Sequence, residues 1–128
     1  LNHHMPPIDV ELVRTLENVG VKYDYVNRTL YVRYMDDYQF RLSTRFKNHT
    51  AYVVTPLNED AKKLNYTLRT EEKYKDEQLE INTKNTNLGN DYSKMVALFE
   101  IYSDAAPEVK CILKIVYDKD YTNPDYKK

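Results

Sequence analysis

The sequence has no tryptophan, two glycines and one cysteine among its 128 residues, and each scarcity excludes something. One cysteine cannot form an internal disulfide, which argues against a disulfide-stapled secreted scaffold and for a reducing compartment. Two glycines cannot build a phosphate-cradling loop, so nucleotide-binding motifs are missing. No stretch approaches the roughly 18 consecutive apolar residues of a membrane-spanning helix. Cys111 lies in an apolar run, and we predict that it is a small buried residue.

The charges are balanced, with 19 Lys plus Arg against 20 Asp plus Glu. Such a chain has no electrostatic footprint for nucleic acid and no basic patch for a membrane. Arg41, Arg45 and Lys47 project from one face of a predicted strand, but acidic residues are interspersed elsewhere and favour a solvated surface. We therefore expect neither nucleic-acid binding nor membrane insertion, and a cytoplasmic location.

The residue sets that catalysis requires are also missing. No Gly-x-Ser-x-Gly elbow occurs, and no Cys/His cluster has the spacing of a zinc site. His49 is the one histidine within the patterned part of the chain, so any Ser-His-Asp or Cys-His arrangement would have to use it. The sequence predicts a protein that is not an enzyme and that carries neither cofactor nor metal.

What the sequence does contain is tyrosine, 13 residues of it, in short segments that alternate apolar and polar side chains. Tyrosine suits half-buried strands, because its ring packs while its hydroxyl stays wet. The clearest run is 38–46, and others lie at 21–25, 30–34, 51–55, 64–68, 79–83, 95–102 and 109–117. The run at 95–102 is apolar on both faces, interrupted only by Glu100. About eight strands at this spacing predict an all-β, antiparallel sandwich, since the gaps are too short for crossover helices.

We expect one such domain at 8–118, preceded by a disordered lead-in at 1–7 and followed by a flexible polar tail at 119–128. Residues 8–19 allow two interpretations. Asp9 could cap a short helix with Gly20 just past its end, or the same residues could form an irregular first strand.

Binding sites on a β-sandwich usually lie in loops held by the rigid sheets. The connection Lys47, Asn48, His49 and Thr50 joins two well-patterned strands and carries an ammonium, an amide, an imidazole and a hydroxyl. We predict that these four residues contact a folded protein partner. An exposed sheet edge that accepts a partner strand is the second possible mode.

Strands from Val21 to Asp118, an Asn/Lys/Tyr-rich composition and His49 in an inter-strand loop make the chain similar to one known family. It resembles the immunoglobulin-like cargo-binding domains of yeast selective-autophagy receptors, which carry α-mannosidase to the vacuole. The resemblance implies an adaptor whose loop histidine, here His49, recognises a vacuolar hydrolase cargo such as α-mannosidase. The alternative helix at 9–19, followed by a strand meander, would instead look like the RWD-type modules of kinetochore subunits.

A further alternative is a secreted or surface structural domain. Three glycosylation sequons occur, at Asn27, Asn48 and Asn65, where chance would give about one. Attached glycans would place the domain in the secretory pathway.

Overall fold

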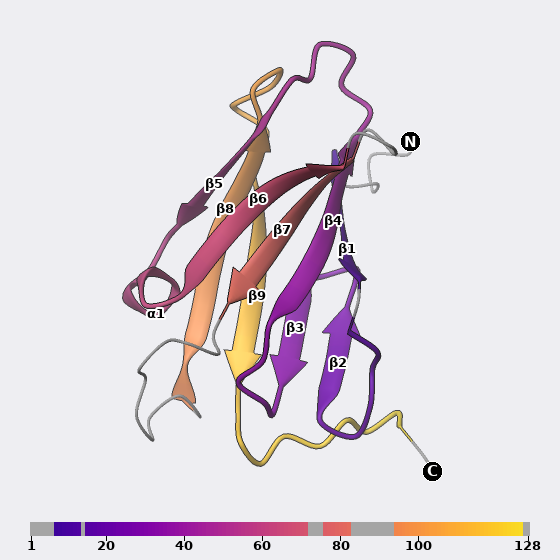
Figure 1. Cartoon of the computed structure of the whole chain (residues 1–128), viewed down its shortest axis with the longest axis vertical. Helices are drawn as coiled ribbons and strands as arrows, with labels where there is room; N and C mark the ends of the chain where they lie inside the picture. The colour runs from indigo at the N-terminus through magenta and orange to yellow at the C-terminus, as the bar shows by residue number, and fades with distance from the viewer. Residues whose placement is uncertain (1–6, 14, 72–75, 83–93, 127–128) are drawn as a thin grey trace.

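Two stacked β-sheets make up the protein in a computed structural model, which describes residues 7–13, 15–71, 76–82 and 94–126 (Figure 1). Sheet A has the order β1-β4-β7-β6 and contains β1 (Ile8–Val13), β4 (Tyr38–Thr44), β7 (Asp76–Asn82) and β6 (Asn65–Glu71). Sheet B has the order β2-β3-β9-β8-β5 and contains β2 (Val21–Asp24), β3 (Thr29–Val32), β9 (Cys111–Tyr117), β8 (Val96–Ser103) and β5 (Tyr52–Pro56). The predicted all-β sandwich is therefore confirmed, with nine strands in the described residues.

One strand pair departs from the antiparallel prediction. β3 and β9 run parallel, with Leu30 opposite Ile115 and Val32 opposite Tyr117, whereas every other pair is antiparallel. Sequence alternation identifies strands but carries no information on which strands become neighbours. The sequence alone therefore does not predict the pairing of two strands that lie so far apart along the chain.

The inward-facing side chains of both sheets form one core, as the two-residue period requires. In β4 the ring of Phe40 and the side chain of Leu42 have no exposed surface, and in β9 Leu113 and Ile115 are equally enclosed. Cys111 is 4% exposed and belongs to this core, which confirms its predicted role as a small buried residue.

The N-terminal ambiguity resolves as a strand. β1 pairs along its whole length with β4, from Ile8 opposite Thr44 to Val13 opposite Gln39, so the helix interpretation of residues 8–13 is wrong. Gly20 does not end a helix. A Cβ there would lie 2.8 Å from the Tyr34 ring, so a larger residue would force that ring to shift. Without the helix, the likeness to RWD-type modules loses its basis.

A single helical turn, α1 (Glu59–Lys62), connects the sheets between β5 and β6. The Asn58 side chain caps it by accepting a hydrogen bond from the Ala61 N–H at 2.9 Å. The Asn58 amide also donates to the Val96 carbonyl at 2.7 Å, which fixes the turn against β8. The turn lies in the polar segment 57–63 between the two strands.

The predicted tail, 119–128, contacts the domain through its described part, residues 119–126. The Tyr121 ring stacks on Tyr31 with centroids 5.5 Å apart, and the Arg33 Nε donates to the Tyr121 carbonyl at 2.8 Å. Asn123 is 3% exposed and its amide donates to the Val21 carbonyl at 3.1 Å. Of the predicted lead-in, 1–7, only Pro7 lies within the described residues.

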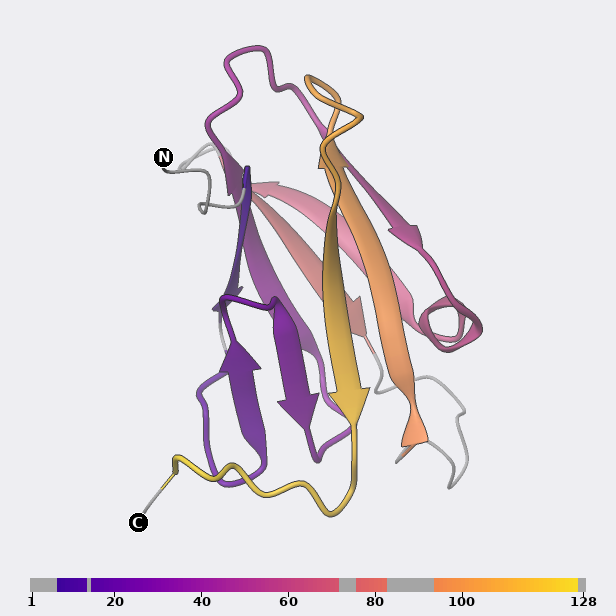
Figure 2. The same ribbon diagram turned by 180° about the vertical axis from the view of Figure 1, so that it is seen from behind.

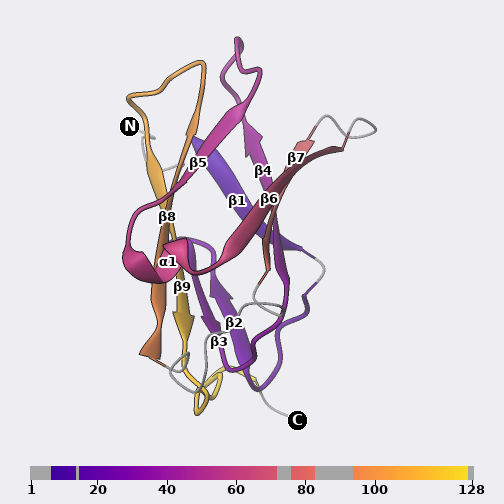
Figure 3. The same ribbon diagram turned by 60° about the vertical axis from the view of Figure 1, so that its left-hand side comes forward.

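Two connections project from the same end of the sandwich, as Figures 1 and 3 show. They are the β4–β5 loop, residues 45–51, and the β8–β9 loop, residues 104–110. We call this end, which carries the predicted contact residues, the loop end. The turn between β3 and β4, with Asp37, lies at the opposite end.

Candidate functional site

His49 is held inside the loop end rather than displayed on it. Its Nδ1 lies 2.8 Å from the Oγ of Ser103 at the end of β8, and its ring centroid is 4.2 Å from that of Tyr52. Only 19% of the side chain is exposed. The imidazole therefore joins the β4–β5 loop to β5 and β8 of sheet B.

Asp104 ties the two loops together. Its carboxylate accepts hydrogen bonds from the Thr50 hydroxyl, from the Thr50 N–H at 2.9 Å and from the Ala51 N–H at 3.2 Å. In return the Asp104 N–H donates to the Ala51 carbonyl at 2.9 Å. These bonds favour the ionised carboxylate and lower the pKa of Asp104 to about 2. The loop is thus fixed by charge-assisted hydrogen bonds, the strongest kind available to it.

A second carboxyl group approaches His49 from sheet A. The Oε1 of Glu77 lies 3.9 Å from the His49 Nε2, while the Oδ1 of Asp104 lies 3.8 Å from the His49 Nδ1. Burial raises the pKa of the Glu77 carboxyl, and His49 and the Tyr52 N–H act in the opposite direction. One imidazole therefore lies between two carboxyl groups whose pKa values shift in opposite senses.

Ser103, His49 and the carboxyl groups have the composition of a catalytic triad, but not its accessibility. Ser103 has no exposed surface, and its Oγ also accepts a hydrogen bond from the Ala105 N–H at 3.1 Å. A nucleophile must come within reach of a substrate atom, and this hydroxyl is enclosed. The arrangement favours a role in holding the loops.

The remaining predicted contact residues face solvent. Lys47, Asn48 and Thr50 are exposed, and the Thr50 hydroxyl is engaged by Asp104. The Lys47 and Asn48 side chains have no polar partner within the described residues. The four predicted residues thus divide into two that order the loop, His49 and Thr50, and two that it presents.

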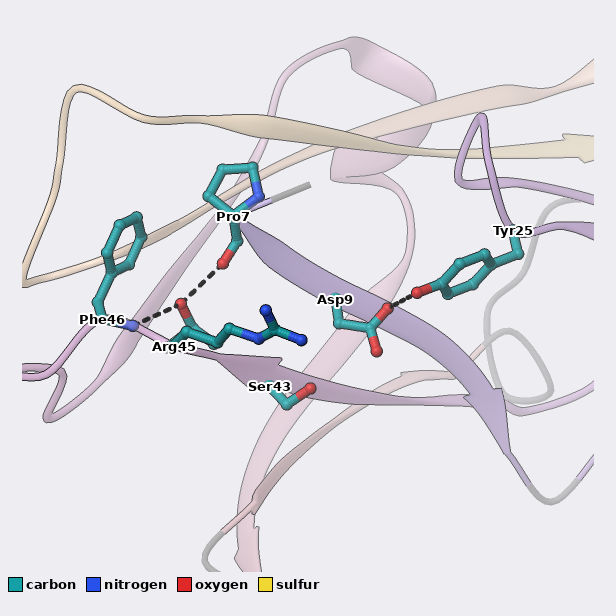
Figure 4. A pocket seen from close by; sticks show the side chains of 7 residues that line it. Pro7, Asp9, Tyr25, Ser43, Arg45 and Phe46 are labelled. Carbon is teal, nitrogen blue, oxygen red and sulfur yellow. Dashed lines mark hydrogen bonds between the residues drawn. The ribbon is translucent and has the colours of Figure 1, made fainter. Parts of the chain in front are cut away.

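A pocket of about 490 Å³ opens next to this loop, between the start of β1, the end of β4 and the turn after β2 (Figure 4). Its polar groups include the Asp9 carboxylate, which accepts a hydrogen bond from the Tyr25 hydroxyl. The Arg45 guanidinium and the Ser43 hydroxyl also line it, and neither has a partner in the part of the chain that the structure describes. The lining is completed by Pro7, Thr44 and Phe46.

The sequence did not reveal the pocket, because its walls come from three separate segments. Thr44 joins two of them, since its hydroxyl donates to the Pro7 carbonyl at 2.8 Å. The basic side chains Arg41, Arg45 and Lys47, which the sequence placed on one face, have different surroundings. Arg41 pairs with Glu11 at 3.0 Å, Arg45 lines the pocket, and Lys47 lies in the loop.

Within the described ranges, no three His, Cys, Asp or Glu side chains are placed to hold a metal ion together. Among the same residues, no helix has the length and apolar character needed to cross a membrane.

The fold and the contacts at the loop end define a β-sandwich domain with an ordered polar loop end. Comparisons with protein-family models, with curated proteins and with solved structures find no match for this chain.

Proposed function

We propose that this domain is a non-enzymatic adaptor that binds a folded protein through its loop end. The observation that carries the proposal is the ordering of the β4–β5 loop by Asp104 and His49 while Lys47 and Asn48 remain unpaired and exposed. A loop that is ordered before binding loses little conformational entropy when a partner docks.

The pocket supports the same surface. It brings the unpaired Arg45 guanidinium and the Phe46 side chain, both at the start of the loop, together with the unpaired Ser43 hydroxyl. Interfaces favour arginine and aromatic side chains near their centre. The loop and the pocket together offer a mixed surface, on which Lys47, Asn48, Arg45 and Phe46 make the contacts and His49 and Thr50 hold their geometry.

The resemblance to cargo-binding domains of selective-autophagy receptors makes a vacuolar hydrolase such as α-mannosidase the first partner to test. A cytoplasmic location follows from the same proposal. Titration of purified α-mannosidase with the domain, followed by calorimetry, measures the affinity directly.

We expect the double variant K47A/N48A to bind at least about fivefold more weakly, because truncation of central contact residues costs more than about 1 kcal/mol. D37A, in the exposed turn at the opposite end, is the matched control and should bind as the unmodified protein does. H49A should also weaken binding while the domain stays folded, since the imidazole orders the loop. No binding, or equal affinity for K47A/N48A and the unmodified domain, would contradict the proposal.

A second candidate function is a secreted or surface structural domain. It is favoured by one observation: the asparagines of all three sequons, Asn27, Asn48 and Asn65, are exposed. Mass spectrometry of protein purified from its natural source would detect glycans there. A glycan on Asn48 would also obstruct the loop end, so that result would replace the first proposal.

A further inference from the structure

The outer face of sheet B is mostly apolar across β9, β8 and β5, the last three strands in its spatial order. Along β9, β8 and β5, the outward side chains other than Thr55, Glu100 and Lys114 are aliphatic or aromatic. Ile112 and Val53 are each 37% exposed, and Leu57, which follows β5, is 43% exposed. The set, named here the apolar face, comprises Val53, Leu57, Val96, Leu98, Tyr102, Ile112 and Val116.

Strand register makes these side chains one continuous patch. Val53 lies opposite Tyr102 and Val96 lies opposite Val116. Between these pairs, Leu57 donates its N–H to the Leu98 carbonyl at 2.8 Å, which puts it beside Leu98. In Figure 2 this face is turned toward the viewer, and no described segment crosses its middle. Contiguous apolar surface of this kind marks an interaction site.

Two charged side chains lie within the apolar face. Glu100 is opposite Ile112, and Lys114 is opposite Leu98, so the two charges are diagonal neighbours on adjacent strands. No ion pair joins them, and neither has another charged partner within the described residues. A carboxylate and an ammonium group that neighbour each other without pairing are available to groups from outside the molecule.

We propose that the apolar face binds the same face of a second copy of this chain. A two-fold axis passing between Glu100 and Lys114 sets the Glu100 of each copy against the Lys114 of the other. A two-fold interface requires such a self-complementary patch, on which one residue contacts a second and the second contacts the first. Two sheets packed face to face through apolar side chains are an ordinary solution for β proteins.

The overall charge favours this occupant. With 19 basic and 20 acidic residues, the chain carries a formal charge of −1, so two copies repel each other little. The strands of the apolar face carry one charge of each sign, Glu100 and Lys114, and at its edge the Lys110 ammonium lies 5.4 Å from the centroid of the Tyr102 ring. The loop end lies outside this surface, so the dimer is independent of the proposed adaptor function.

The test is analytical ultracentrifugation of the full chain over a concentration range from about 1 µM to about 1 mM. We expect reversible dimerisation of the unmodified protein. E100K should set two lysines against each other, and K114E should set two glutamates against each other, so each single variant should dimerise at least about tenfold more weakly. The double variant E100K/K114E restores opposite charges across the axis and should recover the unmodified affinity within about threefold.

T67K is the matched control, because Thr67 is exposed on the outer face of sheet A. It should leave dimerisation unchanged, and far-UV circular dichroism should show that all variants are folded. A monomer at every concentration overturns the proposal, even if the face then binds another protein or a lipid vesicle. Single variants that dimerise normally, or a double variant that stays as weak as the singles, also overturn it.

Discussion

The two sheets have similar inner faces and opposite outer faces. The outward residues of sheet A are all polar except Val13, and several are paired across strands: Asp9, Glu11, Gln39, Arg41, Ser43, Asn65, Thr67, Arg69, Gln78, Glu80 and Asn82. On β5, β8 and β9 of sheet B the outward residues are mostly apolar. A sheet with one wet face needs alternation, whereas a sheet covered on both faces does not. The outer face of sheet A is suited to contact with water, whereas the outer face of sheet B is suited to contact with another apolar surface.

The largest expected effect separates the inner face of sheet B from its outer face. The Phe99 ring has no exposed surface and lies 5.7 Å from the Tyr66 ring, so F99A should lower the free energy of unfolding by about 3–5 kcal/mol. Leu98, the preceding residue on β8, faces outward, and L98A should cost less than about 1 kcal/mol. Urea denaturation at low protein concentration, where self-association does not contribute, measures both. Equal losses would mean that the outer face belongs to the core.

A smaller effect should distinguish two acidic residues on the outer face of sheet A. Glu80 accepts a hydrogen bond from the Gln39 amide at 2.7 Å and lies 3.2 Å from the Arg69 guanidinium, with only 13% of its side chain exposed. E80A would leave the Gln39 amide unpaired, and we expect a loss of about 1–3 kcal/mol in urea denaturation. E11A removes an exposed pair with Arg41 and should cost less than about 1 kcal/mol. The reverse order would show that burial does not set the strength of these contacts.

The smallest effect concerns the loop end, where the pKa of Glu77 in sheet A is raised and that of Asp104 in the β8–β9 loop is lowered. The pKa of Asp104 is lowered from 3.8 to about 2, so the folded state binds this proton less readily than the unfolded state does. The resulting stability is present above about pH 3.8 and is lost as the pH falls toward 2. The D104N melting temperature should therefore change less between pH 4 and pH 2 than that of the unmodified protein. D37N, in the exposed turn at the other end, should show the same dependence of melting temperature on pH as the unmodified protein. If D104N also showed that dependence, the lowered pKa would not belong to Asp104.

The strands could be predicted because their signal is local. The alternation around Phe40 and Leu42 identified β4, and the apolar run from Met95 to Tyr102 identified β8, with apolar residues on both of its faces. Residues 8–13 were ambiguous, since their six residues fit either period until pairing with β4 decides the outcome. Pro56 is the last residue of β5, a position that an edge strand tolerates.

The site could be predicted only in part. His49 was found because it is a histidine in a loop, but its partners Ser103 and Asp104 follow it by more than 50 positions and no spacing rule connects them. The sequence predicted Lys47, Asn48, His49 and Thr50 together as contact residues. It could not show that the His49 side chain is only 19% exposed while those of Lys47 and Asn48 face solvent. The pocket was missed for the same reason, since Asp9, Tyr25 and Arg45 converge only after both sheets have formed.

The parallel pairing of β3 with β9 has a consequence for biosynthesis. β3 is made early, yet the strand that completes its hydrogen bonds ends at Tyr117, near the end of the described chain. During translation, β3 and later β8 each have one edge whose backbone hydrogen bonds stay unpaired until β9 emerges from the ribosome. Such long-range pairing slows folding and leaves strand edges exposed to other chains. The interval between the synthesis of β3 and that of β9 is thus the period in which these strand edges are unpaired.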